Sequence, residues 1–250
     1  MIDCIAFCDM TGGTGKAGSG EALTVDVLAA HAAAVQEQLL GPFADAWDSA
    51  PARCRVGAPG GTDVGPNERL MGYWQTPDQP GAAGYHTVDP KGRPYGKVFL
   101  DDAATLSSGA EAASVIASHE ALEMTLDPTA TLFALNIDGT LYAYEASDAV
   151  EDTTYTASNN VTVSNFLHRA FFDPGAPPPY DHLGLLKAPF TTTPGGYQIS
   201  GTASIGGFRV KAAGPGLSNP VVLARKSRPT SRGAKRKAIF PKAGRADVGS

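Results

Sequence analysis

Residues 118–128 read SHEALEMTLDP, and three of their side chains have the types and spacing of a reactive metal site. His119 and Glu123 are four residues apart, so on a helix both lie on one face and can bind the same metal ion. Glu120 is about 100° away from His119 around such a helix, at the edge of that face. This spacing predicts a divalent metal site at which Glu120 takes a proton from a metal-bound water molecule.

The apolar pattern around these residues predicts that they point inward. On a helical wheel, one stripe contains Val115, Ile116, Leu122 and Leu126, and both His119 and Glu123 fall within it. A buried ionised glutamate costs several kcal/mol unless a proton, a cation or a metal compensates it. Two interpretations follow: a metal site, or a hydrogen-bonded His–Glu pair that fixes the helix against its sheet.

The elements upstream of the motif are short strands and one long helix. Residues 2–8 predict a buried strand, and residues 22–40 predict a helix that ends at Gly41-Pro42, with His31 as a core histidine at the edge of its apolar stripe. Further strand-like runs are residues 53–56, 70–75, 84–89 and 95–102.

The motif itself lies in the strongest helical pattern of the chain, residues 108–126. Ser108 and Glu111 have the spacing of a capping box at its start, and Asp127-Pro128 supplies its end. Beyond it, residues 132–168 predict a meander of short strands with turns at Asp138-Gly139 and Asn159-Asn160, and residues 171–200 predict an ordered, proline-rich surface loop.

The composition agrees with a loop-rich α+β fold. The 250 residues include 29 glycines and 19 prolines, which favours many turns between a few helices. The three cysteines, Cys4, Cys8 and Cys54, show neither a disulfide framework nor CxxC spacing, which favours a reducing compartment. The N-terminus lacks the features of a signal peptide, and no stretch is long and apolar enough for a membrane span.

A broader resemblance is carried by five blocks in a fixed order within residues 25–200. They read AGYHTVDPKGRPYGKVFLDD, ASHEALEMTLDP, LYAYEASDAVEDTTY, VSNFLHRAFFDP and PFTTTPGGYQIS. Together they resemble an HExxE family that recurs in bacteriophages and prophage-bearing bacteria, itself similar to the zincin metallopeptidases. His168 departs from that pattern, where an apolar residue or proline is expected, so no role is carried over to it.

This resemblance implies a zincin-like fold in which the helix packs on a small mixed sheet. In the similar gluzincin arrangement, a glutamate some twenty residues beyond the helix is the third metal ligand, and a nearby aspartate orients a ligating histidine. Glu145 lies 22 residues after Glu123 and Asp148 follows it. By this analogy His119, Glu123 and Glu145 bind the metal, and Asp148 orients His119.

The substitution of a histidine by Glu123 bears on the metal and on its power as a catalyst. Two carboxylates neutralise a divalent zinc, so the ion lowers the pKa of a bound water less than it does with two histidines and one glutamate. The harder donor set also accepts manganese or calcium beside zinc. The motif thus predicts a peptidase of low activity that acts on a peptide or protein.

An oxyanion donor is the remaining part of such a site. The side chains that offer one are His86, Tyr144, His168, Tyr180 and His182, each of which also fits a structural role. His182, in the sequence Pro179-Tyr180-Asp181-His182, is the first candidate.

The charge is distributed unevenly along the chain. Residues 225–250 contain nine Lys or Arg and one acid, which gives this tail a charge of +8 against −13 for the remainder. The chain is therefore divided into a zincin-like domain (1–200), a short β-like extension (201–224) and a basic tail (225–250). The tail fits either contact with nucleic acid or an acidic surface, or a solvated terminus.

Three functions follow from these features. The first is a zincin-like metal-dependent hydrolase, a peptidase in which Glu120 activates a metal-bound water. The second is a phage virion or assembly protein that keeps a degenerate zincin scaffold, with a structural metal, and contacts other virion proteins. The third is a nucleic-acid binder, which rests on the tail alone. The expected location is a phage virion or the bacterial cytoplasm, with no membrane contact.

Overall fold

The computed structural model describes residues 4–49, 52–79, 81–202 and 207–212. Most of the predicted 201–224 extension and the whole basic tail 225–250 lie outside the described residues. No helix in the described part of the chain has the length and apolar composition of a membrane span.

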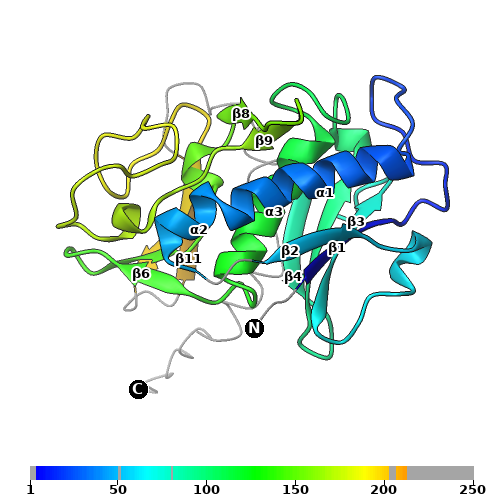
Figure 1. Cartoon of the computed structure of the whole chain (residues 1–250). Coiled ribbons are helices and arrows are strands. Elements are labelled where there is room, and N and C mark those ends of the chain that lie inside the picture. Colours follow the sequence, from blue (N-terminus) through cyan, green and yellow to red (C-terminus); the bar gives the residue numbers. More distant parts are fainter. Residues whose placement is uncertain (1–3, 50–51, 80, 203–206, 213–250) are drawn as a thin grey trace, which may run out of the picture.

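A five-stranded mixed sheet is built from the first half of the chain (Figure 1). Its strand order is β2-β1-β3-β5-β4, in which the first four strands are parallel and β4 is antiparallel to β5. The strands are β1 (Cys4–Asp9), β2 (Arg53–Val56), β3 (Glu68–Trp74), β4 (Gly84–Val88) and β5 (Pro94–Phe99). The predicted runs 53–56, 70–75 and 84–89 therefore coincide with strands, whereas the run 95–102 is a strand only to Phe99 and continues as a 3₁₀ helix over Leu100–Asp102.

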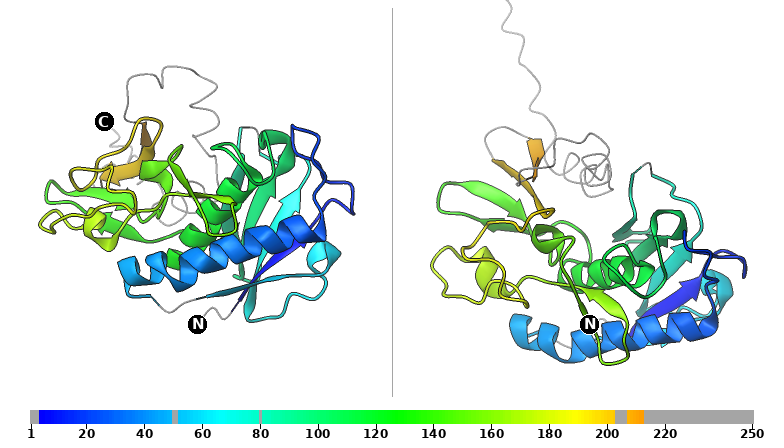
Figure 2. Two further views of the ribbon diagram at one scale, coloured as in Figure 1. Left: turned by 45° about the horizontal axis from the view of Figure 1, so that its top comes forward. Right: turned by 90° about the horizontal axis from the view of Figure 1, so that it is seen from above.

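Two long helices lie side by side on one face of this sheet (Figure 2). Helix α1 (Val25–Leu40) contacts β1 and β2, and α3 (Ala113–Leu126) contacts β4 and β5. The Thr24 side chain caps α1 by accepting the Val27 N–H, and the short helix α2 (Pro42–Trp47) begins directly after Gly41. The predicted end of the first helix at Gly41-Pro42 is confirmed.

The main core fills the space between the sheet and these helices. Alternation along the strands directs Phe7, Met71 and Val98 toward Leu28 of α1 and Leu122 of α3, and all five side chains are buried in one cluster. Full burial of such a side chain stabilises the fold by about 1.5–3 kcal/mol. The core therefore fixes α3 against the sheet independently of its polar side chains.

Helix α3 begins later than the sequence pattern predicts. Residues 108–111 lie outside the helix, whose N-cap is Ala112 and has no side-chain hydrogen bond. The Glu111 carbonyl accepts the Ala104 N–H at 2.9 Å, and Thr105 and Ala112 form an isolated β-bridge. The predicted capping box was wrong, because these backbone hydrogen bonds hold residues 104–112 in a separate turn.

The second half of the chain forms two smaller β units rather than one meander. An antiparallel sheet of order β11-β10-β7-β6 lies on one side of α3, and the hairpin β8–β9 packs along α3 and is a separate sheet. These strands are β6 (Phe133–Leu135), β7 (Thr140–Ala143), β8 (Thr154–Thr156), β9 (Thr162–Ser164), β10 (Tyr197–Thr202) and β11 (Gly207–Ala212). The predicted short strands and turns are present, but their pairing is divided between two sheets.

Four short 3₁₀ helices complete the described structure. They are η1 (Pro59–Gly61), η2 (Leu100–Asp102), η3 (Asp148–Val150) and η4 (Arg169–Phe172). From Asp173 to Gly196 the chain has neither helix nor strand. The buried Asp181 carboxylate orders part of this loop by accepting the Leu185 and Leu186 N–H groups and the Asn165 amide. The architecture as a whole is mixed α and β, with a mixed sheet and few helices, in agreement with the expected α+β class.

Candidate metal centre

Five buried polar side chains converge around α3. His119, Glu120 and Glu123 come from the helix, His86 comes from β4, and Asp148 comes from the start of η3. Each has a relative exposure of 5% or less. Their donor atoms fall into two groups that could hold a metal ion: one of His119, Glu123 and Asp148, and one of His86, Glu120 and Glu123.

The first group joins the helix to the segment after β7. His119 Nε2 lies 3.2 Å from Glu123 Oε1 and 3.2 Å from Asp148 Oδ1. The Ser147 N–H donates to Glu123 Oε1 at 3.3 Å, which fixes that oxygen on the side of Asp148. The i, i+4 pairing predicted on the helical wheel is present, and Asp148 lies beside His119, as the gluzincin analogy implied.

The second group joins the helix to β4. His86 Nδ1 lies 3.3 Å from Glu120 Oε2 and 3.6 Å from Glu123 Oε2. Its other ring nitrogen, Nε2, lies 3.2 Å from the carbonyl oxygen of Asp127, just beyond the end of α3. From the sequence, His86 was predicted only as one of five possible oxyanion donors. The signal that could have placed it is strand alternation, because residues 84 and 86 share the face of β4 that the helix covers.

Glu145 and Asp148 follow β7 and were both predicted to act at the metal site, but they take different positions. Glu145 is 4% exposed and belongs to neither group of donor atoms. With Asp148 and Tyr197 it lines a cavity of about 10 Å³, room for about one water molecule. The predicted role of Glu145 as a ligand stays a prediction, and Asp148 is near enough to His119 to be a ligand itself.

The carboxylates dominate the electrostatics of His119. Burial by itself lowers the pKa of this histidine, but the negative charge of Glu123 and hydrogen bonds with Asp148 and Glu123 raise it well above its ordinary value. His119 is thus surrounded by negative charge that favours a cation at this position, whether a proton or a metal ion.

Two glycines lie on the sheet beneath α3, and one of them allows the helix to approach closely. A Cβ atom on Gly84 would lie 2.4 Å from Ile116 Cγ2 and 2.7 Å from the Lys97 carbonyl oxygen. A Cβ atom on Gly96, the partner of His86 across the two strands, would lie 2.5 Å from Met71 Cε but at an ordinary 3.7 Å from Glu120 Cβ. The missing side chain of Gly84 therefore leaves the room in which Ile116 of α3 packs against β4.

Hydrogen bonds from serines tie the opposite side of α3 to β9. The Ser114 hydroxyl donates to the Thr162 carbonyl at 2.7 Å, and the Ser118 hydroxyl accepts the Ser164 N–H at 2.7 Å. At the C-terminal end of the helix, the buried Arg69 guanidinium donates to the Met124 carbonyl, where a positive charge complements the helix dipole. The helix is thus held from three sides.

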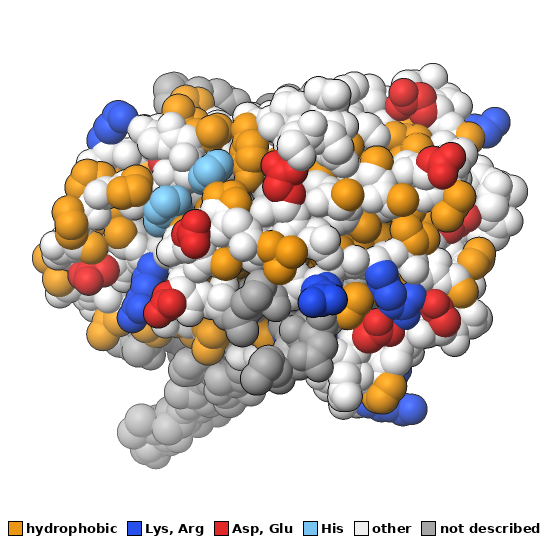
Figure 3. Space-filling view, viewed as in Figure 1, with side chains coloured by type: hydrophobic (Ala, Val, Ile, Leu, Met, Phe, Trp, Pro, Cys, Tyr) orange, Lys and Arg blue, Asp and Glu red, His pale blue; other side chains and the backbone are white. Residues whose placement is uncertain are grey.

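The predicted oxyanion donors other than His86 lie apart from both groups. The His182 ring stacks on Phe166, with centroids 4.8 Å apart, and His182 and His168 line a surface pocket of about 420 Å³. Figure 3 shows histidine side chains gathered at one place on this face. The Tyr180 hydroxyl donates to the Ala176 carbonyl, and Tyr144 packs against Trp47 and Phe172. These contacts are structural, and the role of His182 stays a prediction.

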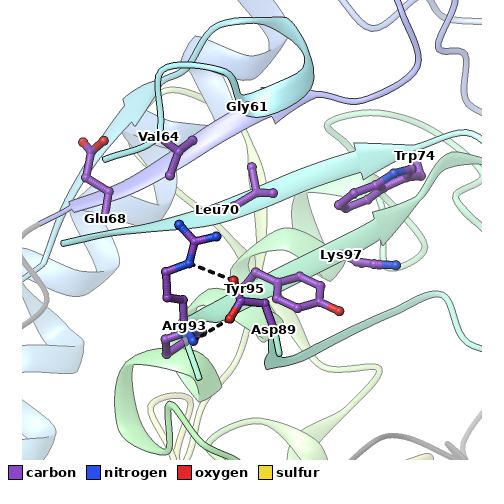
Figure 4. Close-up of a pocket in the computed structure, with 10 residues that line it drawn as sticks. Gly61, Val64, Glu68, Leu70, Trp74, Asp89, Arg93, Tyr95 and Lys97 are labelled. Carbon is purple, nitrogen blue, oxygen red and sulfur yellow. Dashed lines mark hydrogen bonds and ion pairs between the residues drawn. The ribbon is translucent and has the colours of Figure 1, made fainter. Parts of the chain in front are cut away.

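Another groove, of about 380 Å³, lies on the other face of the mixed sheet (Figure 4). Trp74 and Tyr95 contribute its aromatic surface, and the Arg93 guanidinium is paired with the Asp89 carboxylate at 2.7 Å. It contains neither a histidine nor a cysteine, and its Arg93–Asp89 pair is neutral overall. Within the described residues, the groups of side chains that could hold a metal ion are those around α3.

The residues of the first group fit a divalent cation. Two ligands roughly 2.0–2.1 Å from a tetrahedral zinc lie about 3.3 Å apart, close to the 3.2 Å that separates His119 Nε2 from Glu123 Oε1 and from Asp148 Oδ1. One imidazole and two carboxylates suit zinc or manganese. Comparison of the chain with models of protein families, with curated proteins and with solved structures gives no match.

Proposed function

We propose that the protein is a zincin-like metal-dependent hydrolase that cleaves a peptide or protein. The observation that carries this proposal is the position of His119 Nε2, 3.2 Å from both Glu123 Oε1 and Asp148 Oδ1 on a helix packed against a mixed sheet. The peptide class of substrate comes from the resemblance to the HExxE family and not from the geometry.

His119, Glu123 and Asp148 would hold the cation, with zinc as the first candidate and manganese or calcium as alternatives. When bound there, a divalent ion would polarise a carbonyl group and make a water molecule more acidic. Burial of the three ligands strengthens their attraction for the ion, because little solvent screens it.

Glu120 is the proton acceptor of the proposed reaction. Its side chain is fully buried, and Oε2 faces His86. It follows His119 directly on α3, which packs against β4 and β5. Glu120 would accept the proton of the attacking water and pass it to the leaving amine.

The test compares Glu120→Gln with the unchanged protein after each is stripped of metal and reloaded with one equivalent of zinc. We expect the variant to bind the first ion with unchanged affinity, because Glu120 is outside the first group. Cleavage of a casein or mixed-peptide substrate should fall by at least about 100-fold. Unchanged cleavage would contradict the role of Glu120.

A phage structural protein with a degenerate zincin scaffold is the alternative outcome of the same test. In that case the unchanged protein binds zinc and gains thermal stability from it, but cleaves none of the substrates. Detection of the chain at fixed stoichiometry in purified particles would then identify it as a virion component.

A further inference from the structure

His86 has the environment of a metal ligand. Its Nε2 lies 3.2 Å from the Asp127 carbonyl oxygen, which can only accept a hydrogen bond, so Nε2 carries a hydrogen. In the neutral imidazole, Nδ1 is then a lone-pair donor. A metal-bound histidine commonly donates its other ring N–H to a backbone carbonyl in this way.

The lone pair of His86 Nδ1 points at two carboxylates. Glu120 Oε2 is 3.3 Å away and Glu123 Oε2 is 3.6 Å away. Direct N–H···O hydrogen bonds are usually about 2.7–3.2 Å long, whereas two ligands of a tetrahedral zinc are about 3.3 Å apart. The 3.3 Å separation from Glu120 Oε2 is long for a hydrogen bond and equals the edge of a coordination tetrahedron, and the three side chains together could hold a metal ion.

Glu123 connects this set to the first group through its two oxygens. Oε1 faces His119 and the Ser147 N–H, while Oε2 faces His86. The donor atoms of the two histidines do not fall into a single group of the described residues. The geometry therefore describes two neighbouring positions with a shared carboxylate, as in centres that hold two metal ions.

We propose that His86 Nδ1, Glu120 Oε2 and Glu123 Oε2 form a second divalent-cation site, and that a cation bound there blocks catalysis. As a ligand, the Glu120 carboxylate can no longer accept a proton. The inhibitory effect rests on the proposed function, whereas the existence of the site does not. A second ion beside the first is also repelled by it, so it binds more weakly, and inhibition requires excess metal.

The experiment counts zinc ions on the full chain. Metal-free protein is titrated with zinc chloride in a calorimeter, and the ions retained after gel filtration are measured by elemental analysis. The unchanged protein should bind two zinc ions. His86→Ala should bind one, with the affinity of the weaker event lowered by at least about 100-fold. His119→Ala should also bind one, and the double variant none.

The matched control is His182→Ala, which removes a partly exposed histidine that belongs to neither group. It should retain two ions, and loss of one ion from this variant would assign the second ion to the surface and overturn the proposal. One ion on the unchanged protein, as expected if His86 merely pairs with the carboxylates as an imidazolium, would overturn it as well. So would two ions on His86→Ala.

A variant that fails to fold does not leave the question open. His86→Gln keeps much of the volume of the ring and a hydrogen-bonding amide, and circular dichroism shows whether each variant is folded before ions are counted. Two ions without any hydrolysis would reject the proposed function and keep the second site. Where hydrolysis occurs, excess zinc should inhibit the unchanged protein at least about tenfold and should not inhibit His86→Gln.

Discussion

Two buried histidines, His31 on α1 and His119 on α3, have opposite environments. His31 is fully buried, and its ring nitrogens face the Tyr73 hydroxyl at 2.9 Å and the Ser107 hydroxyl at 3.1 Å. His119 is nearly as buried but faces carboxylates. Burial lowers the pKa of His31 to about 4, whereas the carboxylates raise the pKa of His119 well above its ordinary value.

The difference teaches that burial alone does not mark a functional histidine. A hydroxyl can both donate and accept, so it satisfies a neutral imidazole in the core. Carboxylates leave excess negative charge that a proton or metal ion must compensate. The His31 environment is therefore structural, and the environment of His119 is the one that calls for a cation.

The largest expected effect comes from removing the charge of Glu123, which belongs to both groups. Glu123→Gln keeps the shape of the side chain but weakens every zinc-binding event by at least about 100-fold, measured by calorimetry. Glu111→Gln, an exposed glutamate outside α3, is the control and should bind as the unchanged protein does. The contrary outcome is that zinc does not raise the melting temperature of the unchanged protein. The cluster around His119 is then a buried ion pair, and it differs from the surroundings of His31 only in its hydrogen-bond partners.

The next effect tests the close packing of α3 against β4 at Gly84. Gly84→Ala would place a Cβ atom 2.7 Å from the Lys97 carbonyl oxygen, and this backbone atom cannot move aside easily. We expect a loss of about 3 kcal/mol in the free energy of unfolding, measured with urea. Gly175→Ala, whose Cβ atom would have only an ordinary 3.6 Å contact, should change it by less than about 1 kcal/mol. Equal stability of the two variants would show that α3 tolerates displacement from β4.

The pH dependence of stability distinguishes the two histidines. Because its folded pKa of about 4 is below the ordinary value of 6.5, His31 binds a proton more readily in the unfolded chain. As the pH falls from 6.5 to 4, the unfolded state gains protons, and this histidine costs the fold up to about 3 kcal/mol. His31→Gln should lose less stability than the unchanged protein over this range, as followed by thermal unfolding.

That comparison cancels the titration of the α3 cluster, which is present in both proteins. Above pH 6.5 the stability difference between them should be constant. A difference that stays constant down to pH 4 would mean that His31 is protonated in the folded protein, like a histidine among carboxylates.

The smallest expected effect separates the two acids of the segment after β7. Asp148→Asn should weaken zinc binding about 10–100-fold, because Asp148 Oδ1 lies 3.2 Å from His119 Nε2. Glu145→Gln should weaken it less, since Glu145 belongs to neither group. The reverse ranking in calorimetry would restore Glu145 as the third ligand and leave Asp148 to orient His119.

Much of the fold was readable from local patterns. Apolar periodicity predicted the helix of residues 22–40, its end at Gly41-Pro42 and the strands of the mixed sheet, because these elements bury one face in the core. The capping box at Ser108 and Glu111 failed, because the β-bridge of Thr105 with Ala112 holds that segment outside the helix. The single meander failed because the pairing of short strands depends on distant partners such as β10 and β11.

The sequence by itself determined that His119 and Glu123 share the buried face of one helix, because the spacing i, i+4 fixes this for any α-helix. Only the tertiary structure decided what faces them. His86 reaches Glu120 from 34 residues upstream because β4 packs against α3, and Asp148 reaches His119 from 29 residues downstream. Such contacts depend on the packing of elements that are distant in the chain, so helical spacing does not determine them; Asp148 was expected beside His119 only from the resemblance to the gluzincin arrangement, and His86 was not expected beside Glu120 at all.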